Sequence, residues 1–175
     1  MSMSFKVENV NESFSVNKTK YESKIAMLSM YTNYTQTIPT GIDTKISWYD
    51  IDRKNSIGDS ELELTEINTR FINRSNTKNI YSINGYIGWN IGGIPTSSRA
   101  VFIVKNSNVS YNQGRIGYTN YQAGSDYPVT SFIGTIILNP NEYFEIHVWH
   151  NDESSQQINS QIDFPGSRIN IFKHE

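Results

Sequence analysis

The chain has 175 residues, no cysteine, and a formal net charge of −2 with an isoelectric point near 5.9. This length suits one domain with a sizeable hydrophobic core. The charge gives no basic footprint for nucleic acid, and no apolar run is long enough to span a membrane. The absence of cysteine excludes disulfides and thiolate metal sites.

Residue usage favours β-structure. Isoleucine outnumbers leucine, and eleven tyrosines accompany abundant asparagine and serine. Branched and aromatic side chains suit the half-buried surface of a sheet, while few Ala and Leu residues disfavour helices. Asparagine, serine and glycine supply turns between strands. This usage is also typical of AT-rich coding genomes, such as those of low-GC bacteria, their phages and some large DNA viruses.

The chain divides into two parts. Residues 1–24 are polar and have no convincing core pattern, so we interpret them as an arm or the remainder of a stalk. They also lack the apolar block of a secretory signal. From Ile25 onward, turn signals separate short strands at the spacing of a sandwich or barrel. This pattern predicts one all-β domain over residues 25–175.

The expected strands alternate between apolar and polar residues. In chain order they are Lys45–Tyr49, Glu61–Thr65, Thr69–Asn73, Tyr81–Trp89, Ala100–Lys105, Thr130–Leu138, Tyr143–Trp149 and Arg168–Phe172. In the first of them the spacing places Ile46 and Trp48 on one face. Tyr81–Trp89 has the most regular alternation, with Tyr81, Ile83 and Trp89 on one face.

Three further segments have distinct patterns. Ala100–Lys105 is an almost continuous apolar run, which predicts a strand buried on both faces. The sequence Asn139-Pro140-Asn141-Glu142 predicts a tight turn, because proline restricts φ. The stretch Ser110–Val129 has no core stripe and is rich in Gly, Asn and Tyr, so we expect loops there.

Several segments resemble, in their order along the chain, the strand motifs of one known family. Ile80 to Trp89 resembles the motif Y-x-I-x-A-x-V-x-W, and Arg99 to Asn106 resembles R-x-x-x-I-x-K-N. Ile136 to Val148 resembles L-x-L-x-x-G-D-Y-x-E-x-x-V, with Asn141-Glu142 in place of Gly-Asp. Phe164 with Ile169–Phe172 matches a closing F-S-x-I-x-I strand. Residues 37–50 fit the opening strand found in bacterial, phage and viral members of the same family.

Together these segments resemble the globular heads similar to complement component 1q, of the tumour-necrosis-factor-like superfamily. The resemblance implies an antiparallel jelly-roll β-sandwich that forms a homotrimer. It also implies a non-enzymatic head of a surface or virion fibre-like protein, located outside the cell or on a virion or cell surface. Its partners would be a cell-surface receptor, a glycan or another protein. A monomeric carbohydrate-binding jelly roll and a structural capsid-type jelly roll remain alternatives.

Four tyrosines in the stripe-free stretch are the candidate binding residues: Tyr111, Tyr118, Tyr121 and Tyr127. Tyrosine offers a large contact area at low entropic cost and a hydrogen-bonding tip, which suits recognition surfaces and sugar stacking. The equally weighted alternative is that these side chains cover the edge of the sandwich or the contact between subunits.

Metal binding has weaker support. Asp50, Asp52 and Asp59 resemble part of a calcium loop, but Lys54 and Asn55 stand where an EF-hand needs a ligand and a glycine. Solvated loop acids are therefore the favoured interpretation, with structural calcium as the alternative. His147 and His150 are three apart on an expected strand, so they point to opposite faces. We expect them to be surface or packing residues.

No catalytic motif is present. The chain lacks a Gly-x-Ser-x-Gly elbow, a phosphate-binding glycine loop and a His-Glu-x-x-His sequence. The paired carboxylates have simpler explanations: strand alternation for Glu61 and Glu63, and a position beside a turn for Glu142 and Glu145. We therefore expect neither enzymatic activity nor a cofactor.

Overall fold

The computed structural model describes residues 26–32, 34–49, 57, 61–65, 68–90, 98–108, 115–120, 129–158 and 166–174, with only the backbone for Ala26 and residues 115–120. These residues form twelve strands and no helix, so none of them belongs to a helix that could cross a membrane. The strands are β1 (Ala26–Tyr31), β2 (Gln36–Ile38), β3 (Thr44–Lys45), β4 (Leu62–Thr65), β5 (Arg70–Asn73), β6 (Asn79–Asn90), β7 (Ser98–Lys105), β8 (Arg115–Asn120), β9 (Val129–Leu138), β10 (Tyr143–His150), β11 (Gln156–Ile158) and β12 (Arg168–His174). The predicted arm, residues 1–24, lies outside the described residues.

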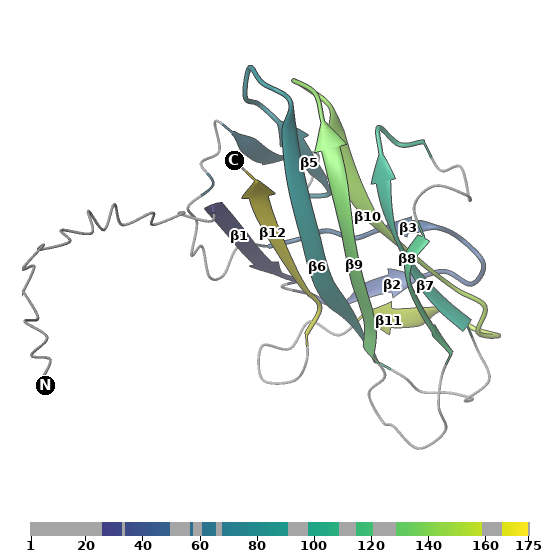
Figure 1. Ribbon diagram of the computed structural model, residues 1–175. Coiled ribbons are helices and arrows are strands. Elements are labelled where there is room, and N and C mark those ends of the chain that lie inside the picture. Colours follow the sequence, from purple (N-terminus) through teal and green to yellow (C-terminus); the bar gives the residue numbers. More distant parts are fainter. Residues whose placement is uncertain are drawn as a thin grey trace, which may run out of the picture.

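The first sheet is built around the long strand β6 (Figure 1). β6 pairs with β12 and β9 along most of its length and with β11 at its C-terminal end. β1 extends the sheet beyond β12, and β2 extends it beyond β11. Strands far apart in sequence thus become neighbours, as a jelly roll requires.

The second sheet is built around β10. β10 pairs with β7 along its length, with β5 at its start and with β3 further on. β4 pairs with β5, and β8 pairs with β7. Every pairing in both sheets is antiparallel, and the two sheets face each other across one core. The predicted antiparallel all-β sandwich is therefore confirmed.

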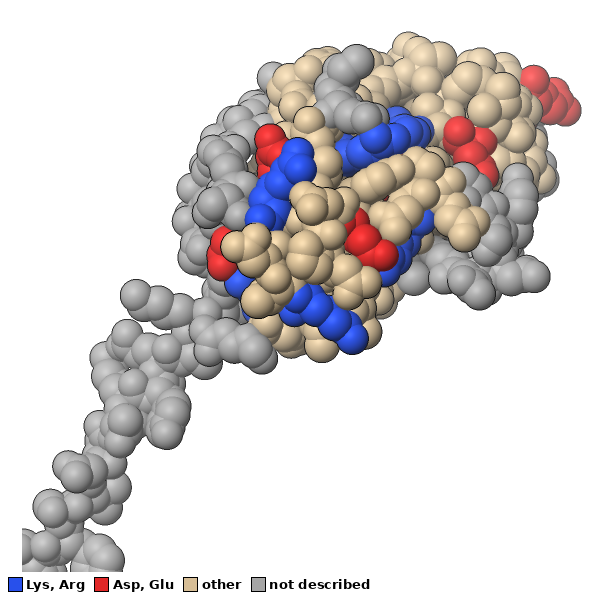
Figure 2. Space-filling view, turned by 90° about the horizontal axis from the view of Figure 1, so that it is seen from above, with Lys and Arg blue, Asp and Glu red and all other residues tan. Residues whose placement is uncertain are grey.

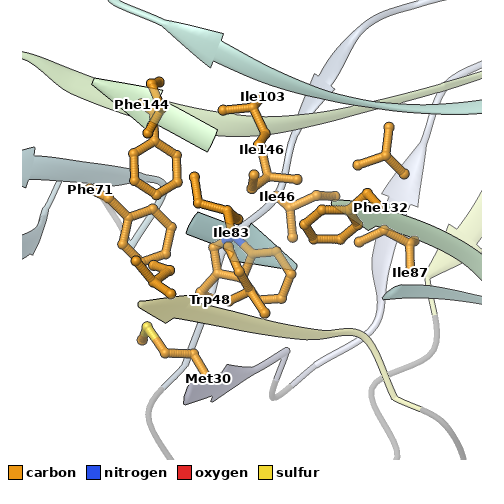
Figure 3. Packing of buried hydrophobic residues seen from close by; sticks show 14 of the residues in the cluster. Met30, Ile46, Trp48, Phe71, Ile83, Ile87, Ile103, Phe132, Phe144 and Ile146 are labelled. Carbon is orange, nitrogen blue, oxygen red and sulfur yellow. The ribbon is translucent and has the colours of Figure 1, made fainter. Parts of the chain in front are cut away.

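The core lies between the sheets and follows the predicted alternation. Tyr81, Ile83 and Trp89 have no exposed surface. Figure 3 shows Phe71 and Phe144 stacked from neighbouring strands, with ring centroids 4.8 Å apart and an angle of 12° between the planes. Burying such rings and branched side chains stabilises the fold by about 1.5–3 kcal/mol for each side chain.

Other patterns are also confirmed. β7 is buried on both faces: Val101 and Ile103 lie in the main core, while Ala100 and Phe102 lie in a smaller cluster on the opposite face. Asn141 has a φ of +65° in the turn between β9 and β10. Asparagine tolerates this left-handed conformation, which explains how it replaces the glycine of the family motif.

Three predictions about strands need correction. The expected strand Lys45–Tyr49 is reduced to β3, although Ile46 and Trp48 are fully buried as expected. The stretch Ser110–Val129 contains a strand, β8, where we expected loops. The sequence also did not single out β1 and β11. Strands β8 and β11 lack a long apolar alternation, and they are stabilised by backbone pairing with β7, β6 and β2.

Candidate functional site

Of the four tyrosines predicted to bind a ligand, only Tyr118 lies among the residues that the structure describes. Tyr118 lies in β8, with its backbone opposite Ala100 of β7, and its side chain is not described. The other three candidate tyrosines, Tyr111, Tyr121 and Tyr127, lie outside the described residues. Their role in binding therefore remains a prediction.

The candidate calcium residues Asp50, Asp52 and Asp59 also lie outside the described residues. In the part of the chain that the structure describes, no group of three or more His, Asp or Glu side chains could hold a metal ion. Calcium binding at the three aspartates is therefore still a hypothesis.

The outer face of the first sheet carries three exposed isoleucines, which we call the isoleucine face: Ile80, Ile133 and Ile137. Ile80 and Ile137 are directly opposite each other in the β6–β9 pair, so their side chains share a face. Ile133, on the same face of β9, is 72% exposed. Exposed apolar groups that gather on one sheet face indicate an interaction surface.

Polar side chains beside Ile133 are already bonded to one another. Ser29 Oγ donates to Asn170 Oδ1 at 2.8 Å, and Asn170 Nδ2 donates to Asn84 Oδ1 at 3.0 Å. This polar ladder crosses β1, β12 and β6. Because these groups satisfy one another, covering this part of the sheet would cost less desolvation energy than covering unbonded amides.

The outer face of the second sheet contains a buried carboxylate. Glu145 has no exposed surface, and its oxygens accept hydrogen bonds from Lys45 Nζ at 2.7 Å, Arg70 Nε at 2.9 Å and Ser107 Oγ at 3.1 Å. Burial alone would raise the pKa of Glu145, but the bonds from Lys45, Arg70 and His147 outweigh it and lower the pKa.

The sequence-based explanation of Glu145 as a residue beside a turn is therefore wrong. Glu142 does hold that role, because it accepts a hydrogen bond from the Asn139 N–H at 2.7 Å. A signal for Glu145 did exist, since a carboxylate within a mostly apolar strand needs buried partners. Its partners come from β3 and β5, and that pairing register was not visible in the sequence.

The two histidines are packing residues on opposite faces of β10, as predicted. His147 is 4% exposed, and its Nε2 lies 3.2 Å from Glu145 Oε2. His150 is fully buried and edge-on to Trp89. The Asp152 N–H donates to His150 Nδ1, so His150 Nε2 carries the proton and donates to the Ile38 carbonyl at 2.9 Å.

Charged side chains at one end of the sandwich alternate in sign. Figure 2 shows lysines and arginines interspersed with carboxylates at the end that lies uppermost in Figure 1. The ion pairs include Lys105 with Glu142, and Lys173 with Glu61 at 2.6 Å. The surface seen in this view therefore has no extensive field of one sign.

Comparison with known proteins supports the fold and goes no further. No family model matches the chain, and no curated protein matches its sequence. A crystal structure of murine APRIL matches with a TM-score of 0.58 and 10% identity, over 85% of this chain and 98% of that one. A structure of Eiger TNF from S. frugiperda matches with a TM-score of 0.54 and 12% identity, over 86% and 93% of the two chains.

These likenesses define the class of fold. The chain has a jelly-roll fold of the tumour-necrosis-factor-like type, as the motif series predicted. The similarity covers most of the chain, although the sequences share about one residue in ten. A fold shared at this level of identity leaves function to be argued from the surfaces of the molecule itself.

Proposed function

We propose that residues 25–175 form the non-enzymatic, trimeric head of a fibre-like surface or virion protein. In this role the head holds three chains together and binds a receptor, a glycan or another protein outside the cell. The tumour-necrosis-factor-like fold supports the proposal. The isoleucine face is the single observation that carries it.

The isoleucine face gives a physical reason for association. Ile80 and Ile137 are 40% and 44% exposed, and Ile133 is the most exposed of the three. They lie on two paired strands in a sheet whose opposite side already packs the core. A second copy of the chain is the occupant we assign to this face, because a ring of identical chains can cover the same apolar surface on each subunit.

Solution mass tests the proposal. Light scattering should give about three times the chain mass of 20.0 kDa at micromolar concentration. A monomer would contradict the trimer and favour the alternative of a monomeric carbohydrate-binding jelly roll. A larger closed shell would instead favour the capsid-type alternative.

We place one recognition surface in the stretch Ser110–Val129. Loops and short strands on a rigid scaffold often carry binding residues, and β8 provides backbone support for this stretch. Changing Tyr118 and Tyr121 together to alanine should abolish binding to target cells while the trimer mass and melting temperature stay unchanged. Dissociation into monomers would instead assign these tyrosines to the contact between subunits.

A further inference from the structure

Arg168 is the one permanently charged side chain on the outer face of β1, β12, β6 and β9, as far as the structure describes these strands. It lies opposite Tyr31 of β1 and Tyr86 of β6, and directly paired residues point to the same face of a sheet. No Asp or Glu stands at any other described position of this face. The face therefore presents a cation without a carboxylate among its described residues.

Arg168 forms no ion pair with a described carboxylate. Its Nε and Nη2 donate to Ser29 Oγ at 3.2 and 3.1 Å, and its Cζ lies 5.1 Å from the centre of the Tyr31 ring. Each of the other arginines with a described side chain pairs with a carboxylate of the same chain: Arg70, Arg74 and Arg99. Arg168 is half-buried, and within the described part of the chain only a hydroxyl and an aromatic ring meet its charge.

The proposed contact between subunits covers Arg168. Ile133 is opposite Asn84 in the β6–β9 pair, and Asn84 is two residues from Tyr86. Two residues along a strand and two strand spacings across the sheet place Arg168 about 12 Å from Ile133. A stable interface buries about 800 Å² on each partner, which corresponds to a patch roughly 30 Å across. A contact that covers the isoleucine face therefore reaches Arg168.

Covering Arg168 without a partner would oppose assembly. Removing water from a charge that gains no opposite charge costs several kcal/mol, which is as much as the burial of one or two isoleucine side chains contributes. The polar ladder of Ser29, Asn170 and Asn84 adds no such cost, because its groups already bond to one another. The neighbouring subunit must therefore compensate Arg168.

We propose that a carboxylate of the neighbouring subunit pairs with the guanidinium of Arg168 in the assembled trimer. A carboxylate suits this position because it brings the opposite charge and accepts hydrogen bonds from a guanidinium. In a threefold ring two different surfaces of the chain meet, so the acid comes from a surface other than the one that holds Arg168. This inference rests on the proposed trimer and names a group that each subunit supplies to the next.

Chemical cross-linking identifies that carboxylate directly. Arg168→Lys puts an amine in the place of the guanidinium. A water-soluble carbodiimide then joins this amine to an adjacent carboxylate as an amide and takes up the released water as a urea. Trimers refolded from a mixture of unlabelled and isotope-labelled chains show which links join two subunits, because only those connect a light peptide to a heavy one. We expect mass spectrometry to find a link between chains from the substituted position to an Asp or Glu.

Arg74→Lys is the matched control for cross-linking. Arg74 pairs with Glu63 of its own chain, and both side chains are about 40% exposed. The same reagent should therefore link these two positions within one chain only. The proposal is overturned if this control reacts while Arg168→Lys gives no link between chains.

Arg168→Gln measures how much the pair contributes to assembly. The neutral side chain leaves the neighbour's carboxylate covered and unpaired, so the trimer should dissociate at concentrations at least about tenfold higher than wild type does. Light scattering on a dilution series measures this shift. Lys78→Gln is the matched control, because it removes one positive charge from an exposed lysine in the β5–β6 connection. It should dissociate as wild type does.

The dilution series also separates this inference from the proposed function. If the wild type is a trimer and Arg168→Gln dissociates at the same concentration, the trimer stands and the pairing of Arg168 is overturned. A monomeric wild type would instead contradict the trimer itself, and this inference with it.

Discussion

Buried charges in this protein are compensated residue by residue. Glu145 is bonded by Lys45 and Arg70, whose side chains are 38% and 20% exposed. Arg99 is 2% exposed, pairs with Asp152 at 3.0 Å and lies over the Trp89 ring. An uncompensated charge at either position would cost several kcal/mol. These residues therefore restrict which strands can lie side by side.

Glu145→Gln tests the buried carboxylate. The folded-state pKa of Glu145 lies below its ordinary value of 4.5. The ionised carboxylate thus stabilises the fold fully above about pH 4.5, and this contribution is lost as the pH falls through the folded pKa. Denaturation at pH 7 should show a loss of about 2–3 kcal/mol in the variant, and the difference from wild type should shrink below pH 4.5.

Glu63→Gln is the control for Glu145→Gln. Glu63 pairs with Arg74 at the surface, where both side chains are about 40% exposed. Its loss should cost less than about 1 kcal/mol, because water screens exposed pairs. If Glu145→Gln destabilised the protein equally at pH 3 and pH 7, lost packing rather than lost charge would be the cause.

At the scale of elements, β6 organises the first sheet. Its inner face supplies Tyr81, Ile83 and Trp89 to the core, while Ile80 and Tyr86 lie on its outer face. Gly85 interrupts the inner row of large side chains. A Cβ at this position would collide with the backbone oxygen of Arg168 and lie 2.6 Å from Phe132 Cζ. The glycine is therefore required for β12 and β9 to pack closely against β6.

Gly85→Ala is expected to be strongly destabilising for so small a change. The backbone oxygen cannot move without disturbing the β6–β12 pairing, so the cost should lie at the upper end of about 1–3 kcal/mol. Chemical denaturation of the variant measures this cost. Ser131→Ala, at an exposed position on β9, is the control and should change stability by less than about 0.5 kcal/mol. Wild-type stability in Gly85→Ala would show that β12 and β6 are further apart than described.

At the scale of the whole molecule, the isoleucine face should determine the state of assembly. Ile133→Glu places a charge at the most exposed residue of the isoleucine face, where desolvation opposes association. Light scattering should therefore show monomers. Ile42→Glu is the matched control, because Ile42 is 56% exposed but lies outside the first sheet, in the β2–β3 connection. The Ile42→Glu variant should remain trimeric.

Thermal unfolding provides a second readout for the same pair of variants. Association stabilises only the folded chain, so the melting temperature of a trimer rises with protein concentration. Wild type and Ile42→Glu should show this rise, and Ile133→Glu should not. If Ile133→Glu were still a trimer, the contact between subunits would have to lie on a surface other than the isoleucine face.

Much of the fold was predictable from local patterns. The alternation in Tyr81–Trp89 and the apolar run of Ala100–Lys105 correctly gave strands and buried faces, because the side-chain period of a strand is two. The tight turn between β9 and β10 followed from the sequence around Pro140, and the structure adds that Asn141 is left-handed there. Strand β8 was missed because backbone pairing with β7 stabilises it without a clear apolar stripe.

The sequence by itself determined the fold class, the inward faces of the long strands and the turn between β9 and β10. These properties depend on neighbours within a few residues, so periodicity and turn chemistry reveal them. The tertiary structure alone decided which distant strands pair. It brought Arg70 to Glu145 and Arg168 to Tyr31, pairs that lie 75 and 137 positions apart in the sequence. Register between such distant segments arises only from packing of the whole sandwich, and no local pattern encodes it.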